Sequence, residues 1–167
     1  GNPKAGPFDV SWTPYLQEIM ESLQIGNGIE TVVFMKGCQI GGTSVSLCTL
    51  LHTANNSPKP TLVVFPTERN AERFVKKKFK PMVQNCRNLQ GLMEEFKTEK
   101  STLELFNFPG CSIGMGNAHA ANSMRMDSCQ MVILDEVSDF PANCSGQGDP
   151  VVIAIGRTST FEGRKKI

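Results

Sequence analysis

One short stretch of this chain combines a lysine, glycines and hydroxyl side chains in an order that suits phosphate binding. The sequence MKGCQIGGTS, residues 35–44, follows an apolar run and precedes a stretch that can form a helix. A glycine-rich turn that enters a helix N-terminus aims several backbone N–H groups at one point. The usual phosphate-loop pattern is GxxxxGK followed by Ser or Thr, whereas here the lysine precedes the glycines. The stretch is therefore either a working phosphate loop or only a glycine-rich turn.

Two registers of this loop are possible. In the first, Gly37 and Gly42 are the loop glycines, and Thr43 stands where the lysine is expected, which leaves no cation in the usual place. In the second, Lys36 replaces the first glycine, Gly41 is the last loop glycine, and Gly42 occupies the lysine position. Lys36 then reaches back over the loop toward the β- and γ-phosphates. We favour the second register because it keeps every function of the loop.

Two adjacent carboxylates follow a second apolar run. In MVILDE, Asp135 and Glu136 come directly after the run MVIL. Hydrolysis of a nucleotide needs one carboxylate that holds Mg²⁺ near a loop hydroxyl, from Thr43 or alternatively Ser44, and a second acid that polarises the attacking water. Because successive strand residues point to opposite sides, we expect one acid to face the metal and the other the γ-phosphate. The alternative, that Asp135 only caps a turn, does not explain the pair.

The elements that must position these groups are predicted as strands alternating with helices. Strands are expected at residues 29–35, 61–65, 102–108, 111–117 and 130–134, and helices at residues 12–23, 43–52 and 66–79. The strands at 29–35, 61–65 and 130–134 are apolar or β-branched runs. The other two differ in composition and are predicted as strands joined by a turn at Pro109-Gly110. Thr13 is predicted to cap the first helix, with Pro14 at its first position. The alternation predicts a parallel sheet covered by helices.

Composition indicates one domain and excludes a strongly basic nucleic-acid binder. The chain has 167 residues, with 17 Lys plus Arg against 16 Asp plus Glu. There is therefore no overall basic field. Basic residues do cluster at 76–80 and at 164–166, where they are either solvated element ends or phosphate contacts. No secretory signal and no run long enough to span a membrane is present.

The cysteines offer one competing kind of site. The chain has six cysteines and two histidines, without a CxxC pair. A zinc site built from Cys111, His119, Cys129 and Cys144 is conceivable, but this spacing fits no compact zinc knuckle. We favour reduced, mostly buried cysteines in a cytosolic protein.

With both motifs in place, the chain resembles the ATPase domain of bacteriophage terminase large subunits of the lambda-like branch. That family has a phosphate loop with an early lysine, as in KGCQIGGT here. WTPYLQEIM is similar to its adenine-side segment, and VVFPTERNAERFVKKKFKPMV to its second strand and helix. ANSMRMDSCQMVILDEVSDFP resembles its Walker B region with the preceding arginine-bearing loop. GDPVVIAIGRTSTFEGRKKI resembles the segment before its coupling motif, so the resemblance covers nearly the whole chain.

The resemblance implies an α/β fold of the P-loop NTPase (ASCE/RecA-like) kind. This is a three-layer sandwich with a mainly parallel central sheet. Residues 1–167 would be the N-terminal ATPase domain, and we expect a truncated piece of a longer protein without its C-terminal nuclease. The resemblance also implies a helix in DPVVIAIGRT, capped by Asp149 with Pro150 at its first position. The β-branched residues of this stretch alone suggest a strand, and we side with the helix.

The resemblance also carries roles to individual positions. It implies ATP contacts from Tyr15, Gln17, Lys36, Gly37, Cys38, Gln39, Ile40, Gly41, Gly42, Thr43 and Ser44. Thr43 and Asp135 would hold Mg²⁺, Glu136 would be the catalytic carboxylate, and Lys36 would assist it. Tyr15 is equally consistent with a helix residue at the edge of the core.

The source of an arginine finger stays open. Some relatives carry an arginine at the position of Gln39, where it stabilises charge on the γ-phosphate. Gln39 cannot supply a cation, so an arginine would act from elsewhere in the chain or from a neighbouring subunit. Arg125 and Arg157 are candidates, and both are also consistent with structural or DNA-facing roles.

The function that the resemblance implies is ATP hydrolysis with Mg²⁺ that moves double-stranded DNA into a procapsid. The setting would be the cytoplasm of an infected or lysogenic host cell. Small terminase subunit and portal protein are the implied partners, in a homo-oligomeric ring, although this chain alone can be a monomer. The parent protein would also be an endonuclease. Two alternatives remain: another DNA-dependent P-loop ATPase or helicase, and a degenerate P-loop domain that binds an anion or a partner without catalysis.

Overall fold

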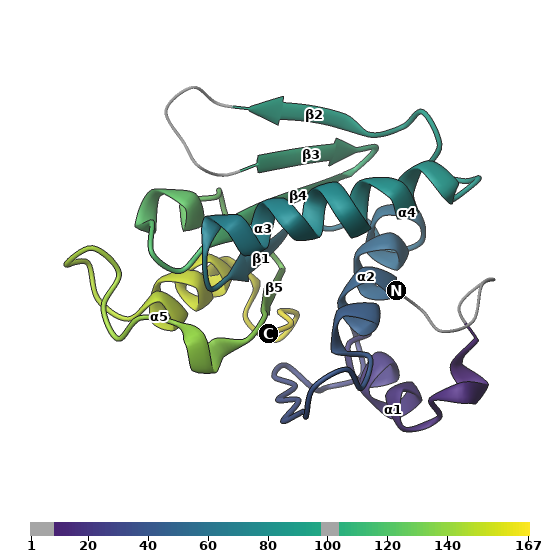
Figure 1. The fold of residues 1–167 in the computed structure, drawn as a ribbon, viewed down its shortest axis with the longest axis horizontal. Helices are drawn as coiled ribbons and strands as arrows, with labels where there is room; N and C mark the ends of the chain where they lie inside the picture. The colour runs from purple at the N-terminus through teal and green to yellow at the C-terminus, as the bar shows by residue number, and fades with distance from the viewer. Residues whose placement is uncertain (1–8, 98–103) are drawn as a thin grey trace.

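The centre of the molecule is a five-stranded mixed sheet (Figure 1). The computed structural model describes residues 9–97 and 104–167. The strands are β1 (Thr61–Phe65), β2 (Glu94–Lys97), β3 (Glu104–Phe108), β4 (Cys111–Asn117) and β5 (Met131–Leu134). They lie in the order β2-β3-β4-β1-β5. β1 is parallel to β4 and to β5, while β3 is antiparallel to β2 and to β4.

Helices of several kinds surround the sheet. The α-helices are α1 (Tyr15–Ser22), α2 (Gly42–Asn55), α3 (Glu68–Phe74), α4 (Lys80–Asn85) and α5 (Pro150–Ile155). A π-helical segment, η2 (Val75–Phe79), joins α3 to α4. The 3₁₀ turns are η1 (Val10–Trp12), η3 (Ala121–Met124), η4 (Val137–Asp139) and η5 (Gly156–Phe161). None of these helices is long and apolar enough to cross a membrane.

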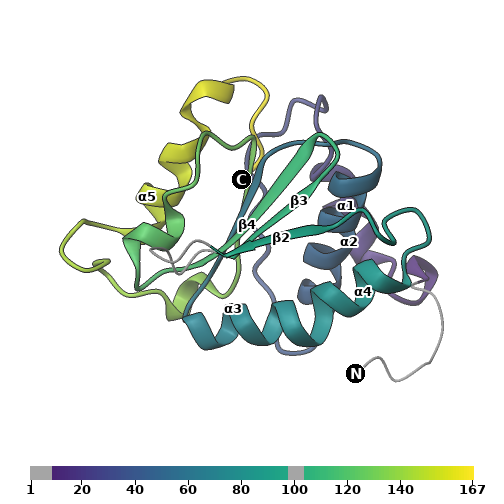
Figure 2. The same cartoon turned by 90° about the horizontal axis from the view of Figure 1, so that it is seen from above.

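The sheet separates two apolar cores, so the chain forms three layers. Because side chains alternate along a strand, Val63 and Phe65 of β1 face one core, whereas Leu62 and Val64 face the other. The first core packs under α2 and the α3–η2–α4 helix, and the second under η3 and α5. Figure 2 shows these two sets of helices on opposite sides of the sheet. This arrangement is the predicted three-layer α/β sandwich.

Most predicted elements are confirmed. α2, β1, β5 and the β3–β4 hairpin lie where the apolar runs and the turn at Pro109-Gly110 placed them. Residues 102 and 103, part of one predicted strand, lie outside the described residues. α5 is a helix rather than a strand, because Asp149 accepts a hydrogen bond from the Val151 N–H at 2.8 Å and Pro150 occupies the first turn. β2 was not predicted.

The strand predicted at residues 29–35 is wrong. The segment is not a regular strand, and Val33 and Met35 are 86% and 96% exposed. Within the described residues its backbone pairs at one place: the Val32 N–H donates to the Ile167 carbonyl, and the Ile167 N–H donates to the Glu30 carbonyl, both at 2.8 Å. A strand needs a neighbour along its length, and the apolar run alone could not supply one.

The predicted cap of the first helix is also wrong. α1 begins at Tyr15 with Pro14 as its N-cap residue, and no side chain caps it. The Thr13 hydroxyl is buried and has no hydrogen-bond partner among the described residues. Thr13 instead contributes its carbonyl, which accepts the Leu16 N–H at 2.9 Å.

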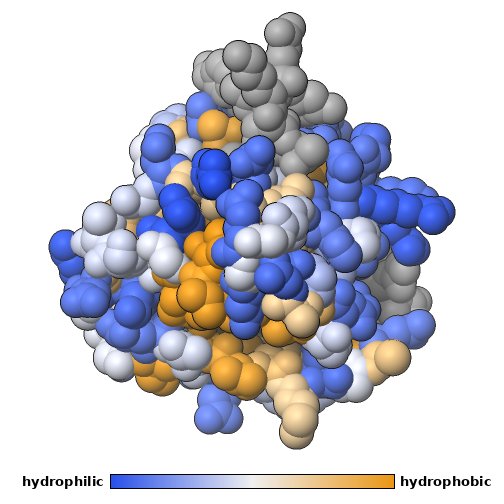
Figure 3. All heavy atoms as spheres, turned by 90° about the vertical axis from the view of Figure 1, so that its left-hand side faces the viewer, coloured by the Kyte–Doolittle hydropathy of each residue, from blue (hydrophilic) through white to orange (hydrophobic). Residues whose placement is uncertain are grey.

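The surface around α5 is mostly hydrophilic, with a smaller apolar area. Figure 3 shows this face, where apolar atoms gather near the centre. Val152 of α5 is 67% exposed and Val137 of η4 is 45% exposed. Some exposed apolar surface is normal on a folded domain.

The cysteines do not form a metal site in the described residues. All six carry free thiols. No group of three or more His, Cys, Asp or Glu side chains gathers there, so the four residues of the zinc alternative do not share a site.

Raising the pH is expected to destabilise the fold through Cys129. Burial raises the pKa of this thiol from 9.0 to about 11. Between these values the unfolded chain has released the proton and the folded protein still holds it, so the free energy of unfolding falls as the pH rises. The full shift corresponds to roughly 2–3 kcal/mol. Urea unfolding between about pH 8 and about pH 10.5 should show this loss in the native sequence. An equally steep loss in Cys129→Ala would assign it to other groups.

Candidate functional site

The loop and the acid pair leave the sheet at the same edge. β5 is parallel to β1, and Lys166 bridges in parallel to Met131 of β5. The next residue, Ile167, bonds to residues 30–32 in the pattern of a parallel pair. Residues 36–41 therefore follow a segment that runs in the direction of β5, and both end at the carboxyl edge. Open α/β sheets bind ligands at this edge.

The last loop residue, Gly41, is a position that only glycine suits. Its φ of 94° lies in the left-handed region, and its carbonyl accepts the Val45 N–H at 3.0 Å to start α2. A Cβ on Gly41 would lie 2.7 Å from Cδ1 of Leu16, which is fully buried. Leu16 of α1 therefore packs directly against the loop at Gly41.

The side chain of Lys36 folds back across the loop and passes over Gly42. A Cβ on Gly42 would lie 2.5 Å from Cδ of Lys36, 2.6 Å from Cε and 3.5 Å from Nζ. The absence of a side chain at Gly42 is thus what makes room for Lys36. The ammonium stands beside the first residue of α2, although its Cα lies six positions earlier in the chain.

Two positive groups meet at the N-terminus of α2. The first N–H groups of α2, at Gly42, Thr43 and Ser44, precede the first helical hydrogen bond and carry the positive end of the helix dipole. The first turn of α2 has no acidic residue. The ammonium of Lys36 adds a full charge at the same end. An anion placed between them would relieve this repulsion.

The other loop residues are partly or fully exposed to solvent. Gly37, Cys38 and Gln39 are exposed, whereas Ile40, Thr43 and Ser44 are partly buried. Gln39 has a φ of 61°, which places a non-glycine residue in the left-handed region at the turn of the loop.

The two residues predicted to lie against adenine differ in their contacts. The Tyr15 hydroxyl donates to the Ile40 carbonyl at 3.2 Å, so Tyr15 touches the loop while its side chain stays 53% exposed. The Gln17 amide donates to the Glu21 carboxylate at 2.9 Å along the same helix. The structure thus brings Tyr15 to the loop, and Gln17 makes its hydrogen bond within α1.

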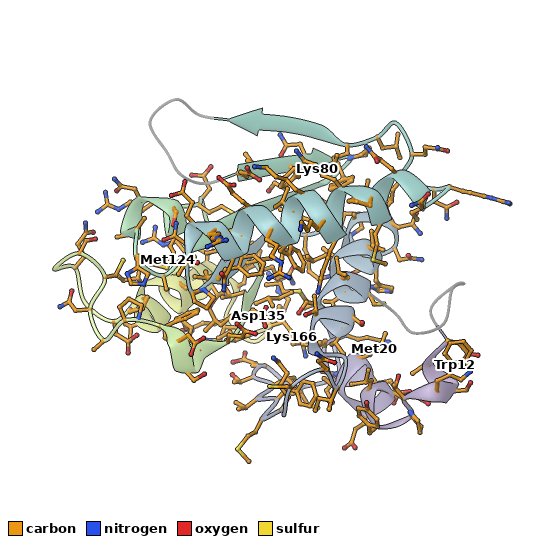
Figure 4. The ribbon with its side chains drawn as sticks, viewed as in Figure 1. Trp12, Met20, Lys80, Met124, Asp135 and Lys166 are labelled. Atoms are coloured by element: carbon orange, nitrogen blue, oxygen red, sulfur yellow. The ribbon has the colours of Figure 1, made fainter. Side chains whose placement is uncertain are left out.

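The acid pair sits directly beyond β5. The Asp135 N–H donates to the Val64 carbonyl of β1 at 3.0 Å, which fixes the backbone of this partly buried residue. Figure 4 shows Asp135 where β5 ends, toward the segment that leads into α2. Glu136 is exposed and has a φ of 54°. The expected strand alternation at this pair is therefore wrong, because the left-handed backbone of Glu136, and not the pleat, directs its side chain.

The two candidate arginines occupy different places. The guanidinium of Arg125 is exposed and donates to the Gln147 side chain at 2.8 Å. The Arg157 carbonyl accepts the Cys129 N–H at 2.9 Å, which places its backbone near the start of β5, away from the carboxyl edge. Nε of Arg157 is buried and has no hydrogen-bond partner among the described residues.

Lys166 holds two distant segments together through its buried ammonium, and the sequence analysis did not single it out. It lies in the basic cluster at 164–166, but it is 1% exposed, so it is not a solvated end of an element. Its ammonium donates to the carbonyls of Ser22 and Ile29 and to the Asn27 side chain. Burial lowers the pKa of this group. Lys166 thereby ties the end of α1 and the segment before the loop to β5, as its position in Figure 4 shows.

Comparison with known proteins gives one consistent answer. Residues 2–167 match the family model for the ATPase domain of the phage terminase large subunit gpA. The terminase large subunit of Enterobacteria phage P21 is 27% identical over 164 residues, which cover 90% of this chain and 25% of that protein. The chain thus spans about a quarter of the length of this curated relative. The large terminase ATPase domain of Thermus phage P74-26 has a similar fold, with a TM-score of 0.59, 16% identity, and coverage of 97% of this chain and 64% of that one.

Proposed function

The chain belongs to the family of phage terminase large subunit ATPase domains, and from this we propose how its carboxyl edge binds and hydrolyses ATP. Residues 36–44 hold the phosphates, with Lys36 and the first N–H groups of α2 around the β- and γ-phosphates. Tyr15 and Gln17 lie on the adenine side, and Glu136 activates the attacking water. The activity drives the movement of double-stranded DNA.

One observation carries this proposal. The ammonium of Lys36 and the N-terminus of α2 converge at Gly42 with no acidic residue in the first helical turn. A cation beside the N-terminus of a helix is unfavourable because both are positive, and an anion bound between them removes this repulsion. A triphosphate supplies that anion, and it also makes the early lysine a functional equivalent of the usual lysine after the last glycine.

The residues present suit Mg²⁺ in the way that ATPases bind it. Mg²⁺ prefers oxygen ligands and keeps several waters, so one or two protein oxygens together with substrate phosphates are enough. The Asp135 carboxylate and the Thr43 hydroxyl, with Ser44 as the alternative, would provide these oxygens. When bound, Mg²⁺ would neutralise charge on the phosphate oxygens.

The reaction is a direct displacement with no covalent intermediate. Glu136 orients a water molecule and draws away its proton as the water oxygen bonds to the γ-phosphorus. The bond between the γ-phosphorus and the β–γ bridging oxygen breaks, and its electrons go to ADP. Lys36 balances the charge that develops on the leaving phosphate oxygens. Glu136 is exposed beyond the end of β5, so a water molecule can reach its carboxylate.

Packaging is the setting that this family implies. ATP turnover would move double-stranded DNA into a procapsid in the host cytoplasm, in a ring of several copies together with small terminase subunit and portal protein. An arginine from elsewhere in the chain or from a neighbouring copy would complete the charge balance at the γ-phosphate, because Gln39 carries no charge.

Calorimetry with a ligand series tests the phosphate site directly. We expect ATP to bind the chain more tightly than ADP, AMP to bind weakest, and Mg²⁺ to strengthen ATP binding. The order follows from the number of phosphates that the loop can contact. Equal affinity for ATP and AMP would contradict phosphate recognition by residues 36–44, whatever the affinity itself.

A further inference from the structure

We propose that α3 and η2 carry a surface that binds the phosphates of duplex DNA, formed by Arg69, Arg73, Lys76, Lys77 and Lys78. We call it the α3–η2 basic face. The inference rests on the proposed function for the identity of its partner and adds the place where that partner is held. All five side chains are exposed.

The π-helical turn creates this face. Val75 and Phe79 of η2 are both fully buried, and Val83 of α4 is 2% exposed. Buried positions four apart would drift around a regular α-helix, which has 3.6 residues per turn. The wider π turn absorbs this drift, so the apolar side chains stay on the core while Lys76, Lys77 and Lys78 all remain outside. Single π turns inside α-helices are frequent at functional sites.

The cations are spaced to meet a phosphate backbone. Arg69, Arg73 and Lys77 lie at intervals of four residues, which places them about 6 Å apart along the helix. Phosphates of one DNA strand advance by about 3.4 Å along the duplex axis, and because the strand winds around that axis, the distance between successive phosphates along the strand is longer and similar to the spacing of these cations. These three side chains line an open hollow of about 600 Å³ together with Asn70, Glu72 and Lys76. A row of this length can follow one strand.

Basic residues outnumber acidic residues on this face. Residues 68–80 contain six basic and two acidic residues. Lys76 pairs with Glu72 at 2.9 Å, an exposed pair that water screens. In the part of the chain that the structure describes, Arg69, Arg73 and Lys77 make no ion pair. The ammonium of Lys80 lies 5.7 Å from the Phe106 ring, so it is not counted in the face.

The composition of the face favours DNA over a protein partner. Specific protein interfaces have an apolar or aromatic centre within a polar rim. No residue from 68 to 80 is among the exposed large apolar side chains, and the apolar residues here are buried. Cations without an apolar centre suit a phosphate backbone, which is read without regard to sequence.

The position of the face links it to the candidate nucleotide site. β1 ends at Phe65, and Thr67 caps α3 by accepting the Asn70 N–H at 3.2 Å. The neighbouring Val64 carbonyl holds the backbone of Asp135. Figure 1 shows α3, η2 and α4 as one continuous helical run across the molecule. The DNA surface thus begins on an element that is anchored at the carboxyl edge of the sheet.

A pair of charge-matched double variants tests the proposal. Arg73→Gln with Lys77→Gln removes two charges from the face, whereas Arg87→Gln with Arg164→Gln removes two exposed charges elsewhere. We would measure the affinity for a duplex of random sequence between about 50 and 200 mM salt. The first pair should weaken binding roughly tenfold per contact near 0.1 M salt and reduce the slope of log K against log salt by about 2. The control pair should change the affinity by no more than about twofold and should leave the salt slope nearly unchanged.

Each outcome has a defined meaning. Equal losses in both double variants, or an unchanged salt slope, would overturn the proposal and leave the face to an acidic protein partner. The absence of duplex binding by the native sequence would overturn it as well. ATP affinity is measured on the same samples, together with the thermal midpoint to show that they are folded. Loss of duplex binding with ATP affinity intact supports the face, whereas a native sequence that binds duplex but no ATP would refute the proposed function alone.

Discussion

Replacing Glu136 with Gln is expected to slow ATP hydrolysis at least a hundredfold and to leave ATP affinity nearly unchanged. The amide keeps the size of the side chain but cannot accept the proton of the attacking water, and positioned acid–base groups contribute about 10²–10⁴ in rate. The backbone should tolerate the change, because Gln39 already adopts a similar φ of 61° in this chain. The measurement is single-turnover hydrolysis of labelled ATP, together with ATP affinity by calorimetry.

The matched control for this variant is Asp139→Asn. Asp139 is an exposed acid in the adjacent turn, so the control removes the same charge from nearly the same place. Its hydrolysis rate should stay within about twofold of the native rate, since a surface charge acts weakly through water. A rate for Glu136→Gln as high as for the control would assign water activation to another group. Both variants are compared in this chain, or in a longer protein containing it if turnover requires one.

Replacing Lys36 with Ala is expected to weaken ATP binding in the presence of Mg²⁺ by tenfold or more, about 1.4 kcal/mol. The reason is that the ammonium beside Gly42 is the cation that the structure places at the N-terminus of α2. Calorimetry measures the loss, and Lys78→Ala is the control because it removes an exposed lysine from another helix. Unchanged affinity would reject the register in which Lys36 replaces the usual lysine.

Gly42→Ala tests independently whether the position of the Lys36 ammonium matters for ATP binding. The added methyl would lie 2.5 Å from Cδ of Lys36, so the lysine must move away although it is still present. ATP affinity should therefore fall with Lys36 intact. If both changes act through the position of the ammonium, the double variant should bind ATP no worse than Lys36→Ala, because effects on one interaction do not add. Fully additive losses would indicate that the methyl blocks the phosphates directly.

The sequence carried the information for elements whose signals are local. The continuous apolar runs at 61–65 and 131–134 became the neighbouring strands β1 and β5, whereas the helix that begins after Asp149 was predicted from the family resemblance against the local strand preference of the valines. The glycine loop before α2 and the acids after β5 were also readable, because these residue types suit only a few backbone and charge environments. The placement of both motifs at one edge then follows from parallel strands.

Other features depend on contacts between residues that are distant in the chain, and only the tertiary structure decided them. Residues 29–35 look like a buried strand by composition, yet strand formation requires a partner, and the described chain offers one only at Ile167. Lys166 looks like a surface lysine, but in the fold its ammonium is surrounded by acceptors at Ser22, Asn27 and Ile29, up to 144 positions earlier in the chain. The path of Lys36 across Gly42 and the left-handed backbone of Glu136 are likewise set by packing and turn geometry. The sequence alone thus determined which chemical groups are available and which elements carry them, while the direction and surroundings of those groups came from the packing of the folded chain.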